Sequence, residues 1–396
     1  MPGSLNGPLT APVRQSGVRA HNLALVLQTV ANSADPISRA SVAGATGLTR
    51  ATVSTLVDDL VSGGLLAELD PAPRTGAGRP AVGLALDRDG PAGLGLEINV
   101  DYLAACVVDL TGAVRHRLVE HADQRPAGAA AALAGLGRLA ARARSLAEAD
   151  GLPVAGAGLA VPGLVTATGL VRVAPNLGWQ DVDVRALLRA TPALADLPLT
   201  VDNEANLAAL GELRANGGTP SFVYISGEIG VGAGIVLDGV LYRGRRGWSG
   251  EIGHLTVHPD GRRCRCGANG CLEQYAGLEA ILREAGVTAI EQIGAPLTSA
   301  GGALGLALAA VVNLLDLGTI VLGGIYTPLL PWLRDGVEAE LRQRVLTADL
   351  APIDLRAAVL GGDAAMRGAA ELVIRSVQEN PAAYLSQRGL SRAGGL

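Results

Sequence analysis

The sequence contains no lysine, and all 32 of its basic residues are arginine. This absence excludes a phosphate-binding loop built on lysine, a Schiff-base lysine and a lysine general base. Acidic residues number 37, which gives a formal net charge of −5. Any nucleic-acid binding must therefore belong to one local surface and not to the molecule as a whole.

Long apolar runs, a signal-like N-terminus and dispersed cysteines are also absent. No run of about 18 apolar residues is free of charged, polar or Gly/Pro interruptions, so we expect no membrane span. Residues 1–18 lack the apolar centre of a secretory signal and are expected to form a flexible tail. Three of the four cysteines are clustered and Cys106 is isolated, which disfavours a secreted disulfide framework. We expect a cytoplasmic protein.

The chain is long enough for two or three domains, and its first part predicts a helix-turn-helix. Of its 396 residues 49% are hydrophobic and 17% charged, as in folded proteins. Residues 22–34 predict a first helix. In the stretch from 36 to 66, Ser38 and Thr49 can cap two helices separated by a turn at Gly47. Apolar residues then recur at helical spacing and bury one face: Val53, Leu56, Val57, Leu60 and Val61.

Two short strands, Leu65-Leu66 and 81–87, complete a predicted winged helix-turn-helix over residues 19–90. The loop between them is "PAPRTGAGRP", in which Arg79 suits insertion into a minor groove. Base contacts are expected from Arg50, Ser54 and Thr55 on one helix face, and Thr49 is expected to lie nearer a phosphate. An amphipathic three-helix cap with a turn-rich linker is the alternative. Six arginines against five acidic residues over 1–80 predict no tight non-specific binding.

From about residue 91 the pattern changes to α/β. The stretch "GLGLEINVDYLAACVVDLTGAVRHRLV" predicts strand, turn, strand, Asp-x-x-Gly turn and strand, and the segment that begins at Ser221 repeats this order. Two such units, each followed by helices, predict a duplicated α/β fold with a cleft between two lobes. We expect a small lobe over 91–203 together with about 372–396, and a large lobe over 204–371. The expected helices are Ala127–Ala149, Ala205–Asn216, Leu278–Ala285, Gly302–Leu315 and Leu330–Arg344.

The clustered cysteines have the spacing Cys264-x-Cys266-x4-Cys271, downstream of two histidines. Three thiolates and one imidazole complete the tetrahedral set of a structural Zn²⁺ and leave no position open for a catalytic water. The segment that follows the cysteines is acidic at its start, which disfavours a DNA-binding finger. On spacing alone, either His254 or His258 could be the fourth ligand.

Several motifs occur together with the helix-turn-helix and its "GRP": "VPGLV" (161–165), "APNLGW" (174–179), "VDNEAN" (201–206), "GEIGH" (250–254) and "CRCGANGCLE" (264–273). In this combination the chain resembles the ROK family (repressors, open reading frames and kinases), in its transcriptional-regulator branch. The resemblance implies an actin-like, sugar-kinase (ribonuclease H-like) domain of two lobes after the winged helix-turn-helix. It also favours His254 over His258 as the zinc ligand.

The resemblance implies a sugar site in the interlobe cleft. Carboxylates and amides offer paired acceptors and donors to a ring of hydroxyls. His254 can bind metal through one ring nitrogen and a sugar through the other. The implied sugar-binding residues are Asn176, Asn203, Glu204, Glu251, His254 and Glu273.

The phosphate-binding turns of the family's kinases are altered here. The first turn reads Glu97-Ile98-Asn99-Val100-Asp101, so Asn99 and Val100 replace permissive glycines and Asp101 would repel a phosphate. The second turn places Glu228 where a polyphosphate would lie. Glu204 stands at the position of the general base and is one methylene longer than the usual aspartate. We expect no catalytic residue and no ATP-dependent phosphorylation.

The sequence thus predicts a sugar-responsive transcriptional regulator that acts as a repressor. Its expected partners are operator DNA and a small sugar effector, its expected cofactor is a structural Zn²⁺, and it is expected to form a homodimer or homotetramer. The alternatives are an active or bifunctional ATP-dependent sugar kinase and a DNA-binding protein controlled by a protein partner. The effector could be a glucose, an N-acetylated sugar or a pentose.

Overall fold

The computed structural model describes residues 15–69, 82–215 and 219–389. Its N-terminal part has three helices, α1 (Gln15–Ala31), α2 (Arg39–Thr46) and α3 (Arg50–Ser62), followed by strands β1 (Leu66–Leu69) and β2 (Gly83–Leu86). The strands pair antiparallel, with Leu66 opposite Leu86. Helix α1 begins at Gln15, so the expectation of a flexible tail over residues 1–18 is wrong for 15–18. Arg79 lies outside the described residues.

Local hydrogen bonds explain where α2 and α3 begin. The Ser38 side chain accepts a hydrogen bond from Ser41 N at the start of α2, and that of Thr49 accepts one from Thr52 N at the start of α3. Gly47 ends α2 in the left-handed conformation, with φ 73°. These caps were expected from the sequence, and they fix the turn of a helix-turn-helix.

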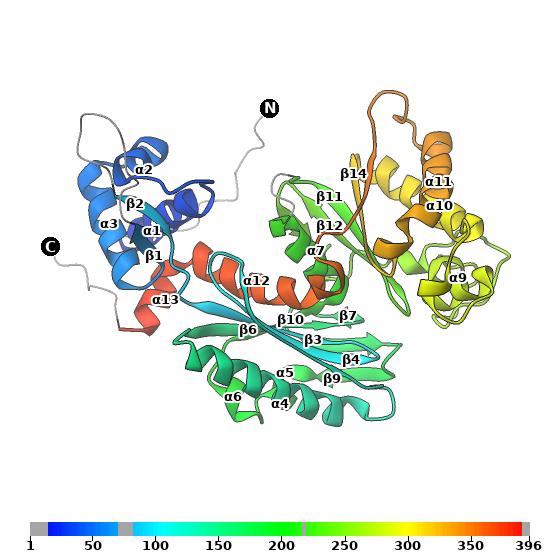
Figure 1. Ribbon diagram of the computed structural model, residues 1–396, viewed down its shortest axis with the longest axis horizontal. Helices are drawn as coiled ribbons and strands as arrows, with labels where there is room; N and C mark the ends of the chain where they lie inside the picture. Colours follow the sequence, from blue (N-terminus) through cyan, green and yellow to red (C-terminus); the bar gives the residue numbers. More distant parts are fainter. Residues whose placement is uncertain (1–14, 70–81, 216–218, 390–396) are drawn as a thin grey trace.

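The small lobe is built on a five-stranded sheet in the order β10-β6-β3-β4-β5. The strands are β3 (Ala92–Ile98), β4 (Tyr102–Val108), β5 (Val114–His121), β6 (Val154–Val161) and β10 (Leu199–Asn203). One face is covered by α4 (Gly128–Ala149), with the short helices α5 (Val184–Leu188) and α6 (Pro192–Ala195) nearby (Figure 1). A separate sheet of three strands adjoins it: β7 (Leu164–Val165), β8 (Leu170–Ala174) and β9 (Trp179–Asp183).

The large lobe repeats this plan with a sheet in the order β13-β12-β11-β14-β15. Its strands are β11 (Phe222–Gly227), β12 (Val231–Leu237), β13 (Val240–Tyr242), β14 (Thr319–Gly324) and β15 (Asp354–Ala357). In both sheets the first strand pairs antiparallel with the second and parallel with the fourth in chain order. The shared strand order and polarity confirm the predicted duplication.

Alternate residues of the large-lobe strands serve two cores. Val223 and Ile225 of β11 face α10 (Thr298–Leu315) and α11 (Tyr326–Arg344), whereas Phe222 and Tyr224 belong to the core around α7 (Glu204–Ala215). Short helices α8 (Glu273–Ala276) and α9 (Leu278–Ala285) follow the cysteine cluster. Within the described ranges α10 is long and apolar enough to cross a membrane, but half of it is buried. Its apolar composition is explained by its place in this core.

Helices α7 and α12 (Ala364–Glu379) lie against each other between the two sheets (Figure 1). Glycines permit this close packing. A Cβ on Gly95 of β3 would lie 1.9 Å from Met366 O, and one on Gly368 would lie 1.6 Å from Leu207 O. The expected lobe boundary between residues 371 and 372 is therefore wrong, because it would divide the continuous helix α12.

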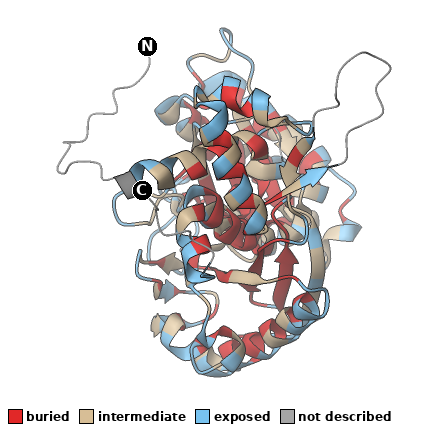
Figure 2. Cartoon of the chain, turned by 90° about the vertical axis from the view of Figure 1, so that its left-hand side faces the viewer, coloured by how far each residue is buried: buried red, intermediate tan, exposed pale blue. Residues whose placement is uncertain are grey.

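The helix-turn-helix shares a core with the small lobe and the C-terminal helices. Leu56 and Leu60 of α3 belong to the same buried cluster as Cys106 of β4, Ile374 of α12 and Leu385 of α13 (Pro381–Gln387). Figure 2, seen from the side of α1–α3, shows buried residues on the near helices and on the strands behind them. The N-terminal helices are thus fixed to the rest of the molecule by apolar contacts.

Candidate functional site

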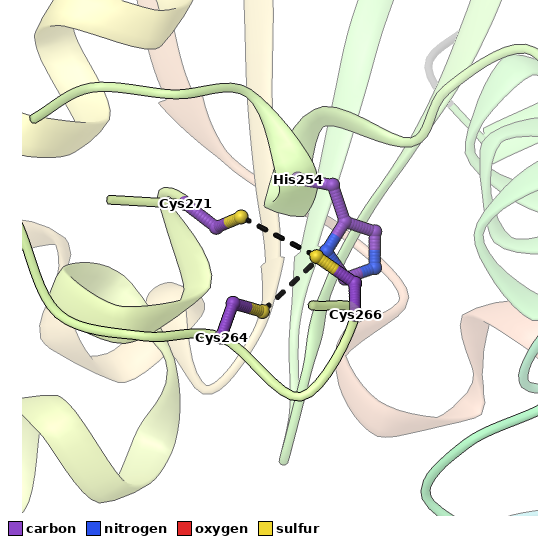
Figure 3. Close-up of side chains that lie close together, drawn as sticks. All are labelled: His254, Cys264, Cys266 and Cys271. Atoms are coloured by element: carbon purple, nitrogen blue, oxygen red, sulfur yellow. Dashed lines mark hydrogen bonds between the residues drawn. The ribbon is translucent and has the colours of Figure 1, made fainter. Parts of the chain in front are cut away.

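Four side chains of types that can ligate a metal ion converge beside the large-lobe sheet. His254 ends a short 3₁₀ helix, and Cys264, Cys266 and Cys271 follow in the next loop (Figure 3). One ligand atom from each residue can be chosen so that all lie within 4.8 Å of one another. Cys264 Sγ is 3.8 Å from His254 Nδ1, and Cys266 Sγ is 3.6 Å from Cys271 Sγ.

The loop backbone builds this cluster through two tight turns. Cys264 N donates to Ala268 O at 2.8 Å, and Gly267 allows the turn with φ 97°. Cys271 then forms an isolated bridge with Thr256, which returns it to the segment that carries His254. The sequence therefore folds two separate loops onto one point.

The spacing of the cluster fits a tetrahedral metal ion. With Zn–S bonds of about 2.3 Å, sulfur atoms at two corners of a tetrahedron are about 3.8 Å apart, close to the distances found. Burial raises the pKa of the Cys271 thiol to about 12, whereas a hydrogen bond from the Ala268 backbone lowers the pKa of Cys266. Holding all three cysteines as thiolates at this distance requires a cation. The rival ligand His258 instead packs against the Tyr275 ring at 4.4 Å between centroids, outside the cluster.

The predicted sugar-binding residues adjoin this cluster on one side. A Cβ on Gly230 would lie 2.7 Å from Glu273 Oε2 and 3.1 Å from Asn176 Nδ2, so these two side chains meet at that glycine. They line a cavity of about 30 Å³ together with Arg265 and Arg283. Glu251 lies near enough to His254 and Glu273 for both charges to affect its pKa, which burial raises.

Asn203 and Glu204 lie at the start of α7, on the other side of the cleft. Asn203 Oδ1 accepts hydrogen bonds from Ala205 N and Asn206 N, and its Nδ2 donates to Gly163 O at 3.0 Å. Asn203 therefore caps the helix and has little free hydrogen-bonding capacity. Glu204 lines a second cavity of about 20 Å³, so the six predicted residues do not line one common cavity.

The second cavity is lined by Glu97, Glu204 and Glu228, all named from the sequence, and also by Tyr102, which was not. Tyr102 Oη donates to Glu97 Oε1 at 2.5 Å and accepts from Asn99 Nδ2 at 3.1 Å. The other Glu97 oxygen accepts from Met366 N at 3.1 Å. Glu97 and Tyr102 flank the turn between paired strands, so the strand register could have revealed this contact. This network occupies the region of the first altered turn.

Electrostatics in this cavity favour protonated carboxyls. Burial, opposed by the hydrogen bond from Tyr102, raises the pKa of Glu97 to about 7. Burial and the charge of Glu97 raise the pKa of Glu228 to about 8. Burial, with the charges of Glu228 and Glu97, raises the pKa of Glu204 well above its usual range. A polyphosphate would add negative charge beside three carboxyls that burial already keeps from ionising, so it could bind here only if all of them stayed protonated.

The outer face of the helix-turn-helix carries the predicted DNA contacts. Thr49, Arg50 and Thr55 are exposed, and Ser54 is partly buried. Arg39 is not available in the same way, because it pairs with Asp58 and Glu68, each at 2.7 Å. Among the described residues Arg50 has no ion-pair partner, so its guanidinium is free for an external ligand.

The chain is similar to known proteins over most of its length. The protein-family model described as "ROK family" matches residues 93–376. The xylose repressor of Bacillus spizizenii is 27% identical over 400 residues, covering 91% of this chain and 96% of the repressor. A solved ROK family transcriptional regulator, a homologue of the E. coli MLC protein, has a TM-score of 0.76 at 25% identity and covers 94% of this chain and 99% of its own.

A kinase is also similar, over a smaller part of the chain. The solved ROK family glucokinase from Streptomyces griseus, in complex with glucose and AMPPNP, has a TM-score of 0.60 at 28% identity. It covers 71% of this chain and 98% of its own. The two regulators described above thus extend over a larger share of this chain than the glucokinase does.

Proposed function

Since the chain belongs to the ROK family, we propose that it is a sugar-responsive, DNA-binding transcriptional repressor. The observation that carries this proposal is the core that joins the helix-turn-helix to the kinase-like domain through α12 and α13. A DNA-binding unit that shares a core with the kinase-like domain can change position when the lobes of that domain move. The near full-length similarity to the xylose repressor of Bacillus spizizenii supports this function.

We assign operator binding to the exposed face of α3, with β1, β2 and their loop as a wing. We assign base-edge contacts to Arg50, Ser54 and Thr55, since Arg50 and Thr55 are exposed and Ser54 is partly exposed. Thr49 lies at the helix N-terminus, so we assign it a phosphate contact. We place Arg79 in a minor groove, as the resemblance to the family's "GRP" motif suggests. Two such units in a homodimer or homotetramer would match the two halves of a near-palindromic operator.

The effector site proposed here is the cleft beside the cysteine cluster. Asn176, Glu251 and Glu273 offer acceptors and donors for sugar hydroxyls, and Glu204 approaches from α7. Asn203 caps α7 and has only its second amide N–H left to offer a sugar. The cavities of about 20 and 30 Å³ are smaller than a sugar requires, so binding would need the lobes to move.

We further propose a structural Zn²⁺ bound by His254, Cys264, Cys266 and Cys271. A bound Zn²⁺ would neutralise the thiolates and tie together the two loops that carry Glu251 and Glu273. Since His254 directs Nδ1 at the cysteines, its Nε2 remains for a sugar hydroxyl.

Lobe movement can reach DNA through α12. The N-terminal end of α12 touches Glu97 at the cleft through Met366 N, and the helix leads into α13, whose Leu385 packs on Gly63 at the end of α3. A sugar that prefers one lobe arrangement would thus shift the spacing of two recognition helices. We place this regulator in the cytoplasm, where operator DNA is accessible.

The experiment combines DNA binding with a sugar panel. Footprinting on the DNA upstream of the protein's own gene should give a protected near-palindrome, and D-xylose, D-glucose or N-acetylglucosamine should release it. Arg50→Ala should weaken operator binding by at least about fivefold, whereas the exposed Arg189→Gln, far from α3, should not. No protected site, or no release by any panel sugar, would contradict the proposal.

A phosphorylation assay with the same sugars tests the alternative function, an ATP-dependent sugar kinase. We expect no ADP release with Mg-ATP, because Glu97, Glu228 and Tyr102 occupy the region where phosphates would approach the backbone. Sustained ADP release that Glu204→Gln abolishes would instead establish a sugar kinase.

A further inference from the structure

A cavity of about 220 Å³ lies away from the proposed sugar site, where α7, α12 and the turn between β4 and β5 meet. Its walls include Thr111 and Gly112 of the turn, Arg214 and Ala215 at the end of α7, and Arg367 and Glu371 on α12. A single water needs only about 10–15 Å³ of such space, so the cavity can hold a small molecule. The two helices lie side by side in Figure 1.

Positive charge exceeds negative charge around this cavity. Glu371 Oε1 accepts from Arg214 Nη1 at 3.2 Å and from Arg375 Nε at 3.3 Å. Arg367 Nη2 donates to the Gly112 carbonyl at 3.5 Å, and among the described residues Arg367 has no carboxylate partner. The cavity lining therefore holds two guanidinium groups, Arg214 and Arg367, and one carboxylate, which leaves one net positive charge; Arg375 pairs with Glu371 from outside the lining.

Neighbouring carboxylates are engaged elsewhere. Asp363 pairs with Arg117 at 2.8 Å, and Glu212 accepts hydrogen bonds from the backbone N–H groups of Val359 and Leu360. Asp109 caps the β4–β5 turn by accepting from Thr111 N and Ala113 N, and it lies 3.5 Å from Arg115. These groups therefore do not neutralise Arg367.

Glu371 also has an unsatisfied oxygen. The residue is 3% exposed, and its Oε2 has no hydrogen-bond partner among the described residues. An unpaired buried acceptor is costly, and such atoms are found where a ligand completes the site. Glu371 Oε2 therefore lacks a hydrogen-bond donor, next to arginines that can bind an anion.

We propose that this cavity binds a phosphate group, either free or carried by a small metabolite. A phosphate that retains one proton accepts hydrogen bonds from Arg214 and Arg367 and donates its P–OH to Glu371. Sulfate has no such proton near neutral pH and would leave the carboxylate facing an oxyanion without a donor. The site thus selects a protonated oxyanion.

The position gives this ligand influence over the lobes. Arg214 belongs to a helix that packs on the large-lobe sheet, and Gly112 belongs to a turn of the small lobe. A phosphate held between them contacts both lobes and α12 at once. Its affinity therefore depends on the lobe arrangement, which couples it to any ligand of the cleft.

Binding is measured by calorimetry on the full-length protein with inorganic phosphate and with sodium sulfate, at constant ionic strength. Ala215 is exposed at the rim of the cavity, so Ala215→Glu adds a repelling carboxylate without disturbing the core, and Ala215→Gln is its neutral control. We expect the Kd for phosphate to rise at least tenfold in Ala215→Glu and Arg367→Gln. It should stay within twofold of wild type in Ala215→Gln and in Arg138→Gln, an exposed position on α4.

Glucose 6-phosphate distinguishes the two sources of the phosphate group. Competition between it and inorganic phosphate, with tighter binding of the ester, would assign the cavity to a phosphorylated metabolite, and binding of inorganic phosphate alone would assign it to the free ion. The proposed site would be overturned if neither inorganic phosphate nor glucose 6-phosphate bound, or if Ala215→Glu and Ala215→Gln had equal affinity for phosphate. Equal affinity for sulfate would overturn the role of Glu371.

Discussion

Replacing Glu97 by glutamine should make the protein less sensitive to alkaline pH. The Glu97 carboxyl is 2% exposed, and burial raises its pKa from 4.5 to about 7. Because the folded-state pKa lies above the unfolded value, the protonated carboxyl stabilises the fold fully below about pH 4.5. This contribution is lost as the pH rises through about 7.

The magnitude follows from the size of the pKa shift. A rise of about 2.5 units, at about 1.4 kcal/mol per unit, corresponds to roughly 3 kcal/mol of stability, of which about 2.5 kcal/mol falls between pH 5 and pH 8. Glutamine keeps an acceptor for Met366 N and carries no charge. The stability difference between Glu97→Gln and wild type should therefore shift by this amount in favour of the variant as the pH rises.

Urea unfolding followed by tryptophan fluorescence at pH 5 and pH 8 measures this difference. Taking the variant minus wild type at each pH removes the contribution of titrating groups that the charge of Glu97 does not affect. The same comparison in a Glu228→Gln background removes Glu228, whose pKa the charge of Glu97 helps to raise. A difference that stays the same at both pH values would show that Glu97 is not a buried acid with a raised pKa. A difference of the opposite sign would mean that the carboxylate, and not the carboxylic acid, is the stabilised form.

Three other changes test separate features. Elemental analysis should find close to one Zn²⁺ per chain in wild type. Cys264→Ser should remove this metal and lower the Tm, whereas His258→Ala should retain the metal. Arg50→Ala should cost roughly 1–3 kcal/mol of operator binding in a mobility-shift titration while leaving the Tm within about 2 °C of wild type, since its side chain is exposed. Gly95→Ala should lower the Tm by several degrees, because the added Cβ would lie 1.9 Å from Met366 O; Gly302→Ala, which meets nothing within 4 Å, should not.

Features determined by neighbouring residues were predictable from the sequence. The caps at Ser38 and Thr49 form within three residues of chain, and the predicted range Leu278–Ala285 is helix α9 itself. Cys264, Cys266 and Cys271 lie close enough in sequence that their spacing alone indicated a metal cluster. The duplicated strand order was also visible, because each unit repeats the same pattern of apolar runs and turns.

Features that depend on distant contacts were not predictable. The split of α12 between lobes was wrong because its packing relies on contacts such as Gly95 against Met366, which no local pattern reveals. The cavity beside Arg367 was equally hidden, since its three walls come from segments more than a hundred residues apart in the chain. Tyr102 is different: it lies only five residues from Glu97 across the predicted turn, so the expected strand pairing could have indicated their hydrogen bond.

The apolar cluster that includes Leu56 and Leu385 has a consequence for building hybrid regulators. A transplant cut at residue 90 would leave α3 without the C-terminal helix that covers it, and would expose leucines on both fragments. A functional exchange of operator specificity must therefore carry α13 with the N-terminal helices, or change only the exposed face of α3. For this protein, the unit that evolution or a designer can swap is assembled from both ends of the chain.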